Sequence, residues 1–339
     1  MVWLGWLVWA VVPGAVGGWL LTLWWQQSRA DRVAVLCYHR LVPGDSRLNP
    51  EMLAVDPEPS WVAEQGRFAE QVAWLAQNGY TALDLDDWLA IRQGHMPQPK
   101  RSVLFTFDDG YGSVIEVAAP ILAQHHMKAT VFAVLEPDEH SCELVVGKDR
   151  FMRPEELRAL ADAGWSIQSH TVTHAMLPYL DDANLDRELS ESMRRLGELA
   201  GRPVRHICLP RGGVDARVVE HAKRAGYQTC CGIAKGTARF SADPMQLPRL
   251  SPLRHHGAAA IARMLSPIGA TLEVAMARLR IVIPRLFGAK VGYRLRTFLY
   301  SSAFRHLLGP RVQARTLAVL VGIWMLGGAW FYWHVLAGS

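Results

Sequence analysis

Short apolar runs typical of strands alternate with helical patterns in the middle of the chain, and this alternation constrains the fold more than any other feature. The runs are RVAVLCY, SVLFTF, ATVFAV, WSIQS, HICL and QTCCGI. Strand–helix alternation predicts a parallel sheet covered by helices. A count of about seven strands suits a barrel, whose reactive residues lie at the carboxyl ends of strands. The sequence does not decide whether the sheet closes.

Two adjacent carboxylates, Asp108 and Asp109, follow the run SVLFTF and precede Gly110. Neighbouring carboxylates at a strand end repel each other unless a cation or a proton transfer uses them. The glycine permits a tight turn at this point. The pair therefore indicates a metal site or an acid–base site, although an ordinary Asp-Asp-Gly turn is an equal interpretation of the motif alone.

Two histidines, His170 and His174, follow the run WSIQS. Imidazoles four residues apart can converge on one metal if the intervening turn is helical. Two histidines and one carboxylate form a sufficient ligand set that leaves positions for water and substrate. By itself, however, the spacing is more often that of two unrelated loop histidines.

Two further segments follow predicted strands. His39 stands in LCYHR, where a lone histidine is usually a hydrogen-bonding residue of structural importance, and Pro210-Arg211-Gly212-Gly213 follows HICL as a strand-to-helix turn. All four segments lie at predicted carboxyl ends of strands, so a barrel would gather them on one rim.

In combination these motifs resemble the polysaccharide deacetylase family, which is carbohydrate esterase family four or the NodB-homology domain. TFDDG, then SHTVTH some sixty residues later, then a strand with Pro-x-Gly, carry the resemblance over about residues 32–250. VAVLCYHRLVPG and QLPRLSP look closer to the branch of poly-N-acetylglucosamine de-N-acetylases. The resemblance implies a distorted (β/α)7 barrel.

The resemblance also implies roles for the site residues. Asp109, His170 and His174 match the family's metal ligands, and Asp108 matches its catalytic base. His39 takes the general-acid role in the branch with an early Tyr-His motif. A divalent metal would polarise the amide and lower the pKa of a bound water, and this ligand set favours zinc.

The third motif departs from the family pattern. It reads Cys208-Leu209-Pro210-Arg211-Gly212, in which Arg211 replaces an aromatic residue. We expect Pro210, Arg211 and Gly212 to face substrate, with the Arg211 N–H at the oxyanion. The arginine that often orients the catalytic aspartate is absent from its usual place, and Arg205 or Arg249 could replace it. A cation at position 211 could face a phosphate or another acidic group.

Both ends of the chain lack charge. Residues 2–25 and 316–339 contain no Asp, Glu, Lys or Arg. About 20 apolar residues span a bilayer, so the sequence predicts an N-terminal anchor over residues 1–26 and a transmembrane helix over 316–339. Nine basic and no acidic residues lie between Arg278 and Arg315. This pattern predicts a basic amphipathic, membrane-interfacial segment over 251–315 and argues against a nucleic-acid partner.

Charge also predicts location. Basic residues flank both apolar ends only on the side of the central domain, which favours an inner-membrane protein with that domain in the cytoplasm; the polysaccharide branch favours the periplasm. Five cysteines without a framework spacing suggest reduced thiols.

The leading hypothesis is metal-dependent hydrolytic N-deacetylation of an amino sugar at the membrane. The substrate could be a polysaccharide or a lipid-linked glycan, including a lipid-phosphate-linked sugar for a deformylase. The alternative from another class is a non-catalytic glycan-binding barrel in an export assembly.

Overall fold

The computed structural model describes residues 16–29, 31–44, 61–137 and 149–287. The chain divides into two compact units, one formed by Ala30–Leu265 and the other by Met1–Arg29 with Ser266–Ser339. The first unit carries all the motifs singled out above.

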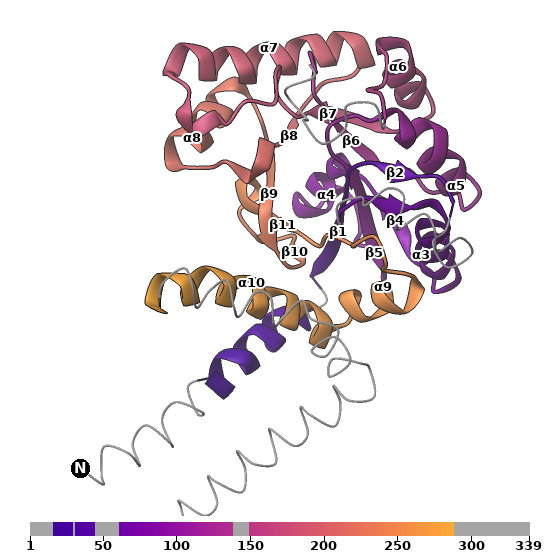
Figure 1. The fold of residues 1–339 in the computed structure, drawn as a ribbon, viewed down its shortest axis with the longest axis vertical. Helices are drawn as coiled ribbons and strands as arrows, with labels where there is room; N and C mark the ends of the chain where they lie inside the picture. The colour runs from indigo at the N-terminus through magenta and orange to yellow at the C-terminus, as the bar shows by residue number, and fades with distance from the viewer. Residues whose placement is uncertain (1–15, 30, 45–60, 138–148, 288–339) are drawn as a thin grey trace, which may run out of the picture. The chain divides into compact units, whose positions relative to one another are not determined.

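The first unit is built around a ring of seven strands (Figure 1). Its members are β1 (Arg32–Tyr38), β5 (Ser102–Phe107), β6 (Thr130–Ala133), β7 (Ser166–Ser169), β8 (His206–Cys208), β9 (Thr229–Lys235) and β11 (Leu247–Arg249). Neighbours in this order pair in parallel. The predicted α/β fold is confirmed.

A bridge at the end of β11 closes the ring. Leu250 forms a parallel bridge with Leu36 of β1. The Cys37 N–H donates to the Leu250 carbonyl at 2.8 Å, and the Leu250 N–H donates to the Val35 carbonyl at 2.8 Å. The sheet is therefore a barrel, and its closure joins the first and last strands of the ring.

Several short strands distort the barrel. One edge of β5 pairs with β4 (Thr81–Leu83) along its first half and with β6 along its second half. β10 (Ala238–Arg239) pairs antiparallel with the start of β1, and β2 (Leu41–Val42) pairs with β3 (Ala63–Glu64) in a separate small sheet. The barrel is therefore irregular at the β5 edge.

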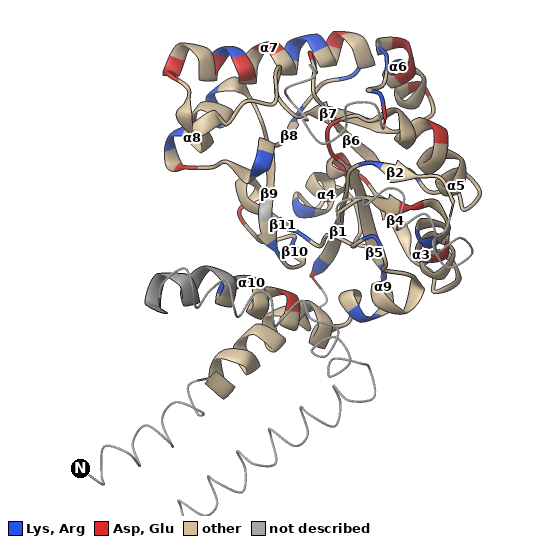
Figure 2. Ribbon diagram, viewed as in Figure 1, with Lys and Arg blue, Asp and Glu red and all other residues tan. Residues whose placement is uncertain are grey.

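Helices pack around the strands, as Figure 1 shows. The described helices of this unit are α3 (Gln65–Gln77), α4 (Leu85–Arg92), α5 (Ala119–Ala123), α6 (Pro154–Asp162), α7 (Asp182–Ala200), α8 (Ala216–Ala225) and α9 (Ala258–Leu265). A π-helical turn, η1 (Val114–Ala118), precedes α5. The side chain of Asp181 caps α7 and Gly201 ends it with φ 64°. Figure 2 shows the many Lys, Arg, Asp and Glu residues along α7.

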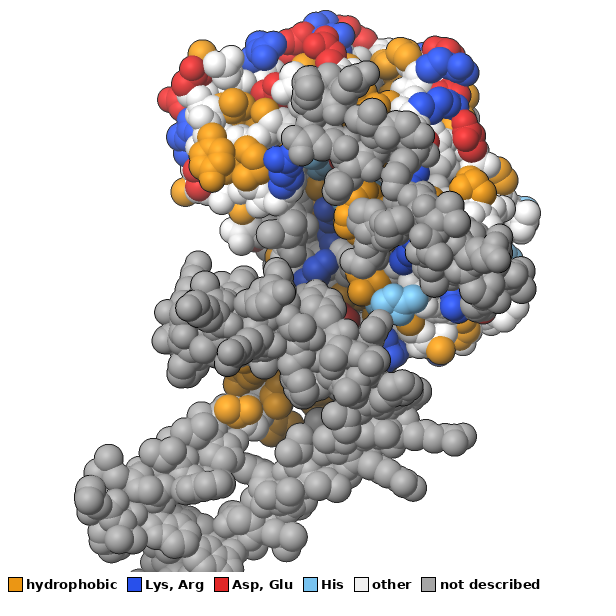
Figure 3. All heavy atoms as spheres, in the orientation of Figure 1, with side chains coloured by type: hydrophobic (Ala, Val, Ile, Leu, Met, Phe, Trp, Pro, Cys, Tyr) orange, Lys and Arg blue, Asp and Glu red, His pale blue; other side chains and the backbone are white. Residues whose placement is uncertain are grey.

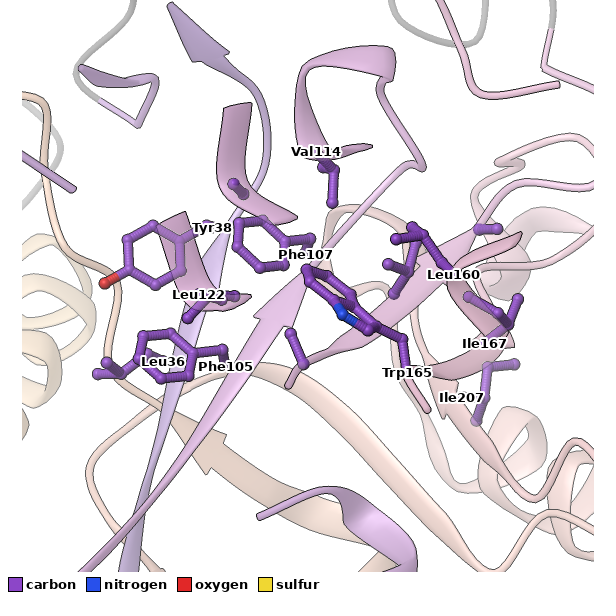
Figure 4. Close-up of a cluster of buried hydrophobic side chains, with 14 of the residues drawn as sticks. Leu36, Tyr38, Phe105, Phe107, Val114, Leu122, Leu160, Trp165, Ile167 and Ile207 are labelled. Carbon is purple, nitrogen blue, oxygen red and sulfur yellow. The ribbon is translucent and has the colours of Figure 1, made fainter. Parts of the chain in front are cut away.

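Alternation along the strands decides which side chains enter the barrel. Successive side chains point to opposite faces of a strand. In β5, Phe105 and Phe107 join the aromatic cluster beneath the helices, where Phe107 stacks on Tyr38 and Trp165 at 5.5 and 6.0 Å between ring centroids (Figure 4). Leu104 belongs to the separate interior cluster with Cys208. By the same alternation, Asp108 follows Leu104 and Thr106 into the mouth of the barrel.

The second unit is described only in part. Residues 16–27 are helical, α10 spans Pro267–Phe287, and Leu23 is buried with Val274 and Ala275. Within the described residues, no single helix has both the length and the apolar composition for a membrane span; α9 together with the first part of α10 passes that test only as a pair. Residues 1–15 and 316–339, which carry most of the two predicted spans, lie outside the described ranges.

The boundaries of the first unit differ from the expected ones. The barrel unit extends to Leu265, whereas the sequence placed its end near residue 250. Gln71 of α3 donates to the carbonyl of His256 at 2.6 Å, and the Arg254 guanidinium pairs with the buried Glu64 carboxylate at 2.8 Å. Residues 251–265 therefore belong with the barrel. Of the rest of the predicted interfacial segment, residues 266–287 belong to the other unit and contain α10, and residues 288–315 lie outside the described ranges.

Candidate active site

The two adjacent carboxylates follow β5 at its carboxyl end. The Asp108 N–H continues the pairing of β5 by donating to the Tyr38 carbonyl at 2.9 Å. At Asp109 the backbone turns into the left-handed region, with φ 71°. This turn separates the two carboxylates, so that each has its own partners although both are at least nine-tenths buried.

Asp109, His170 and His174 converge. The Nε2 atoms of His170 and His174 lie 3.2 and 3.4 Å from the same atom, Oδ1 of Asp109. The Nδ1 atom of His170 donates to the Cys208 carbonyl at 2.7 Å. A proton on Nδ1 leaves the Nε2 lone pair directed at the shared position, as in metal-ligating histidines.

The donor set of these three residues fits a divalent metal. One ligand atom of each lies within 4.8 Å of the others. Among the described residues, no Lys or Arg pairs with Asp109, whose carboxylate is 8 % exposed. A buried anion facing two imidazoles requires a cation. Two nitrogens and one oxygen are ligands that zinc accepts, with positions left open for water and substrate.

Asp108 has a different partner. The Arg249 guanidinium holds it with two parallel hydrogen bonds, from Nη1 to Oδ1 at 2.7 Å and from Nη2 to Oδ2 at 2.8 Å. Arg249 also donates to the hydroxyl of Thr106 and the thiol of Cys208. Of the two candidates for the missing arginine, Arg249 reaches Asp108, whereas Arg205 at the start of β8 pairs with Asp86 at 3.0 Å.

Charge governs the ionisation of these groups. Burial acts to raise the pKa of Asp108, but the charge and hydrogen bonds of Arg249 outweigh it and hold the pKa well below its usual range. Burial also opposes ionisation of Asp109, whose pKa is nevertheless lowered by its interactions with His170 and the other nearby histidines. Burial raises the pKa of Cys37 to about 12, so this neighbour of Asp108 stays a neutral thiol.

His39 also lies beside Asp108. Its Nε2 lies 3.8 Å from Asp108 Oδ2, and its ring packs on Trp61 with 5.1 Å between ring centroids. The side chain is 29 % exposed, so it meets both the carboxylate and solvent. His256 instead accepts the Leu253 N–H at 3.0 Å on Nδ1, which gives it a role in its own loop.

The third motif forms a short turn beside the site. Pro210–Gly212 is a 3-10 turn in which Arg211 has φ 53°. Pro210 and Gly212 are buried and Arg211 is exposed. No described residue pairs with the Arg211 guanidinium. Figure 3 shows the surface of this side of the molecule, with Lys, Arg and His side chains visible in a hollow.

The site also contains residues that the sequence did not single out. Glu188 of α7, Trp61 beside His39, and Cys208 beneath Asp108 all contact it. Cys208 opens the third motif but has no role assigned there, and Glu188 and Trp61 stand in no motif. Glu188 lies within a charged amphipathic helix, where a carboxylate is expected to be on the surface. Only the tertiary structure brings these residues to the site.

Left-handed backbone is concentrated here. The described non-glycine residues with positive φ are Asp109, His126, Thr171, His174 and Arg211, and all but His126 belong to the site. Non-glycine residues in this region are uncommon, and their concentration marks functional sites. Fold and site together are those of an α/β barrel with a candidate metal site at the carboxyl ends of its strands.

Comparison with known proteins supports the resemblance that the motifs carry. Residues 95–230 match the model of the polysaccharide deacetylase family, which is the family that the motifs indicated. The predicted class, hydrolases acting on carbon–nitrogen bonds outside peptides, is confirmed.

Relatives and solved structures agree with this assignment. The Bacillus subtilis protein YxkH, whose name places it among the polysaccharide deacetylases, is 27% identical over 206 residues, which are 60% of this chain and 66% of that protein. A poly-beta-1,6-N-acetyl-D-glucosamine N-deacetylase of Staphylococcus aureus is 23% identical over 56% of this chain and 68% of its own length. The chain thus spans about two thirds of these relatives. The deacetylase PplD of Streptococcus pyogenes has the same fold, with a TM-score of 0.60 and 21% identity over 70% of this chain and 99% of that one.

Proposed function

We propose that this protein removes acetyl groups from the amino sugars of an N-acetylglucosamine polymer, with one divalent metal held by Asp109, His170 and His174. The observation that carries the proposal is the approach of both imidazoles to one oxygen of Asp109, beside a second carboxylate held by Arg249. The name of the staphylococcal relative supports the choice of polymer.

Each residue of the site has a separate role in the proposed amide hydrolysis. The metal, when bound, supplies a Lewis acid that polarises the amide carbonyl and makes a water more acidic. Asp108 accepts the proton of the attacking water, because Arg249 keeps its carboxylate ionised and fixed. The bond from the water oxygen to the carbonyl carbon forms as the carbonyl becomes an oxyanion, and the Arg211 N–H stabilises that charge.

Collapse of the tetrahedral species breaks the carbon–nitrogen bond. His39 donates its proton to the departing amine, so that acetate and a free amino sugar leave. Its place suits this role, because its Nε2 lies 3.8 Å from Asp108 Oδ2 and its side chain also reaches solvent. Base and acid thus lie side by side at the mouth of the barrel.

The test is the release of free amine from N-acetylglucosamine oligomers by purified protein, with and without a chelator, beside His170→Ala. We expect metal-dependent release that the substitution abolishes. A folded, metal-loaded protein that releases no amine from any N-acylated sugar would refute the deacetylase proposal and favour a barrel that only binds glycans.

A second substrate is favoured by Arg211. Its guanidinium is exposed beside the site without a described partner. A planar cation suits a phosphate, which would fit a sugar carried on a lipid phosphate. If Arg211 binds such a phosphate, Arg211→Gln should raise KM for the phosphate-linked sugar and leave KM for neutral oligomers unchanged. A substitution that changes both KM values equally would contradict the phosphate-linked substrate.

We further propose that the protein works at the bacterial inner membrane, anchored by its apolar ends, with its catalytic domain in the cytoplasm. The support is the charge pattern of the sequence. Reporter fusions to the catalytic domain test it: activity of a reporter that works only in the periplasm would place the domain on the other side.

A further inference from the structure

Glu188 is a buried carboxylate on an otherwise solvated helix. It is 2% exposed, although its neighbours Arg187 and Glu191 on α7 are largely or partly exposed. Both of its oxygens are used. Oε2 accepts the N–H groups of Val172 at 2.8 Å and Thr173 at 3.0 Å, and Oε1 accepts the Thr173 hydroxyl at 2.7 Å.

The backbone that Glu188 binds is the turn between the two histidines. The sequence allowed convergence on the condition of a helical turn, and the structure shows another path: Thr171 and His174 have φ 72° and 61°. A left-handed bend of this kind cannot pair its own N–H groups along a helix. Such a path persists only if the surroundings impose it.

Side chains replace the missing helical hydrogen bonds at four successive N–H groups. Ser169 Oγ accepts from Thr171 at 3.1 Å, Glu188 accepts from the next two residues, and Thr171 Oγ1 accepts from His174 at 3.1 Å. Ser169 in turn donates to Ser192 of the same helix at 2.9 Å. Helix α7 is therefore the support on which the turn lies, and Glu188 makes three of its contacts.

We infer that Glu188 is a positioning residue for the metal centre: it holds the 171–174 turn in the left-handed path that directs both imidazoles at Asp109. This inference rests on the proposed metal site. Hydrogen bonds to an ionised acceptor are stronger than those between neutral groups, so a carboxylate suits this task better than an amide. Without it, His174 would lose its fixed direction, because its position depends on the bend that precedes it.

A purely structural role makes a different prediction. If Glu188 only joined α7 to the barrel, its loss would destabilise the metal-free and metal-loaded protein equally, and metal affinity would not change. If Glu188 positions the ligands, metal affinity falls by more than the loss of stability explains. The reason is that metal binding must then also supply the free energy that orders the 171–174 turn. Metal affinity of the folded protein therefore distinguishes the two roles without any measurement of activity.

The experiment uses the full chain and its Glu188→Ala, Glu188→Gln and Thr173→Val variants, with Glu198→Gln as a matched control. Glu198 lies on the same helix and pairs with Arg194 in solvent, 64% exposed. Zinc affinity is measured by competition with a chelator, the cobalt-substituted absorption spectrum reports ligand geometry, and thermal unfolding is followed in the metal-free state.

We expect zinc affinity to fall by about 10–100-fold in Glu188→Ala, the range found for groups that orient metal ligands. Glu188→Gln keeps one acceptor oxygen and should recover part of the loss, Thr173→Val should lose less, and Glu198→Gln should match the wild type. The cobalt spectrum should change in Glu188→Ala only.

Unchanged zinc affinity in the folded Glu188 variants would overturn the inference while leaving the deacetylase proposal intact. If Glu188→Ala does not fold, wild-type affinity in both Glu188→Gln and Thr173→Val has the same meaning. A wild-type protein that binds no zinc or cobalt at all would overturn both proposals.

Discussion

The barrel holds two histidine–aspartate pairs of nearly equal geometry at opposite ends of its strands. At the carboxyl end, His170 Nε2 lies 3.2 Å from Asp109; at the amino end, His206 Nε2 lies 3.3 Å from Asp86. Both histidines are buried, and both use Nδ1 in a second hydrogen bond, to the Cys208 carbonyl and to the Thr229 hydroxyl respectively.

The surroundings separate them. Asp86 is 42% exposed and also pairs with Arg205, so its charge is already balanced. Asp109 is buried, faces the second imidazole of His174, and itself has a left-handed backbone conformation. A histidine–aspartate contact therefore indicates a metal site only where the carboxylate still lacks a cation, and the carboxyl end of the barrel is where function is expected.

The most direct test of the difference between the two pairs is to replace each histidine with alanine in turn. We expect His170→Ala to abolish zinc binding and reduce amine release to background, because a ligand is lost. His206→Ala should retain both and lose about 1–3 kcal/mol of stability from unsatisfied polar groups. Zinc titration, an amine assay and urea unfolding measure these effects; loss of zinc binding in His206→Ala would show that the two pairs are not distinct.

The next largest effect concerns the base. Asp108→Asn should reduce kcat by about 10²–10⁴-fold, the contribution typical of a positioned base, while zinc affinity stays at the wild-type value. The amide cannot accept the proton, but it need not disturb Asp109. A parallel loss of zinc would instead make Asp108 a ligand.

Arg249 is expected to matter for stability as well as activity. Arg249→Met leaves the buried Asp108 carboxylate unpaired, which costs about 3–5 kcal/mol. The partly exposed pair Arg239–Asp31 is the control, since its loss in Arg239→Met should cost only about 1 kcal/mol. Equal losses in urea unfolding would contradict the assignment of Arg249 as the residue that fixes the base.

The smallest effect is the pH dependence of the structural pair. The hydrogen bond from His206 lowers the pKa of Asp86 to about 2. Because this folded-state pKa lies below the unfolded value of about 3.9, the stability is present above about pH 4 and is lost as the pH falls toward 2. With the screening of a half-exposed group, Asp86→Asn should cost about 0.5–1 kcal/mol at neutral pH. If the stability difference between the wild type and Asp86→Asn stays constant down to the lowest pH measured, the interaction of Asp86 with His206 does not depend on charge.

Much of the fold could be predicted from the sequence, because strands and helices carry their periodicity locally. The predicted strands Arg32–Tyr38 and Ser102–Phe107 have the observed bounds. β4 and β11 have three residues each, and Pro248 interrupts the strand pattern of the latter, so their patterns are too short to recognise.

The site residues that stand in motifs at strand ends could be predicted. The contacts that residues distant in the sequence make with them could not. The structure brings Asp109, His170 and His174 together as the motifs indicated, with Asp108 and His39 beside them. The path of the histidine turn was not predictable, because left-handed backbone at Thr171 and His174 depends on acceptors supplied by α7. The sequence also could not distinguish Arg249 from Arg205 as the partner of Asp108, because the answer depends on which end of the barrel each arginine faces.

Closure of the barrel through Leu250 has a consequence for how the functional unit is delimited. The segment that matches the family, 95–230, contains Asp108, Asp109 and both metal-facing histidines. It contains neither His39, which follows β1, nor Arg249 of β11; these are the two strands that meet at the closure, and they lie on either side of the matched segment in the sequence. A fragment cut to the family boundaries would keep the proposed metal ligands but lose the proposed acid, His39, and Arg249, the partner of the proposed base. Insertions or fusions are therefore best placed outside residues 30–265, because the proposed chemistry depends on sequence that flanks the recognisable domain on both sides.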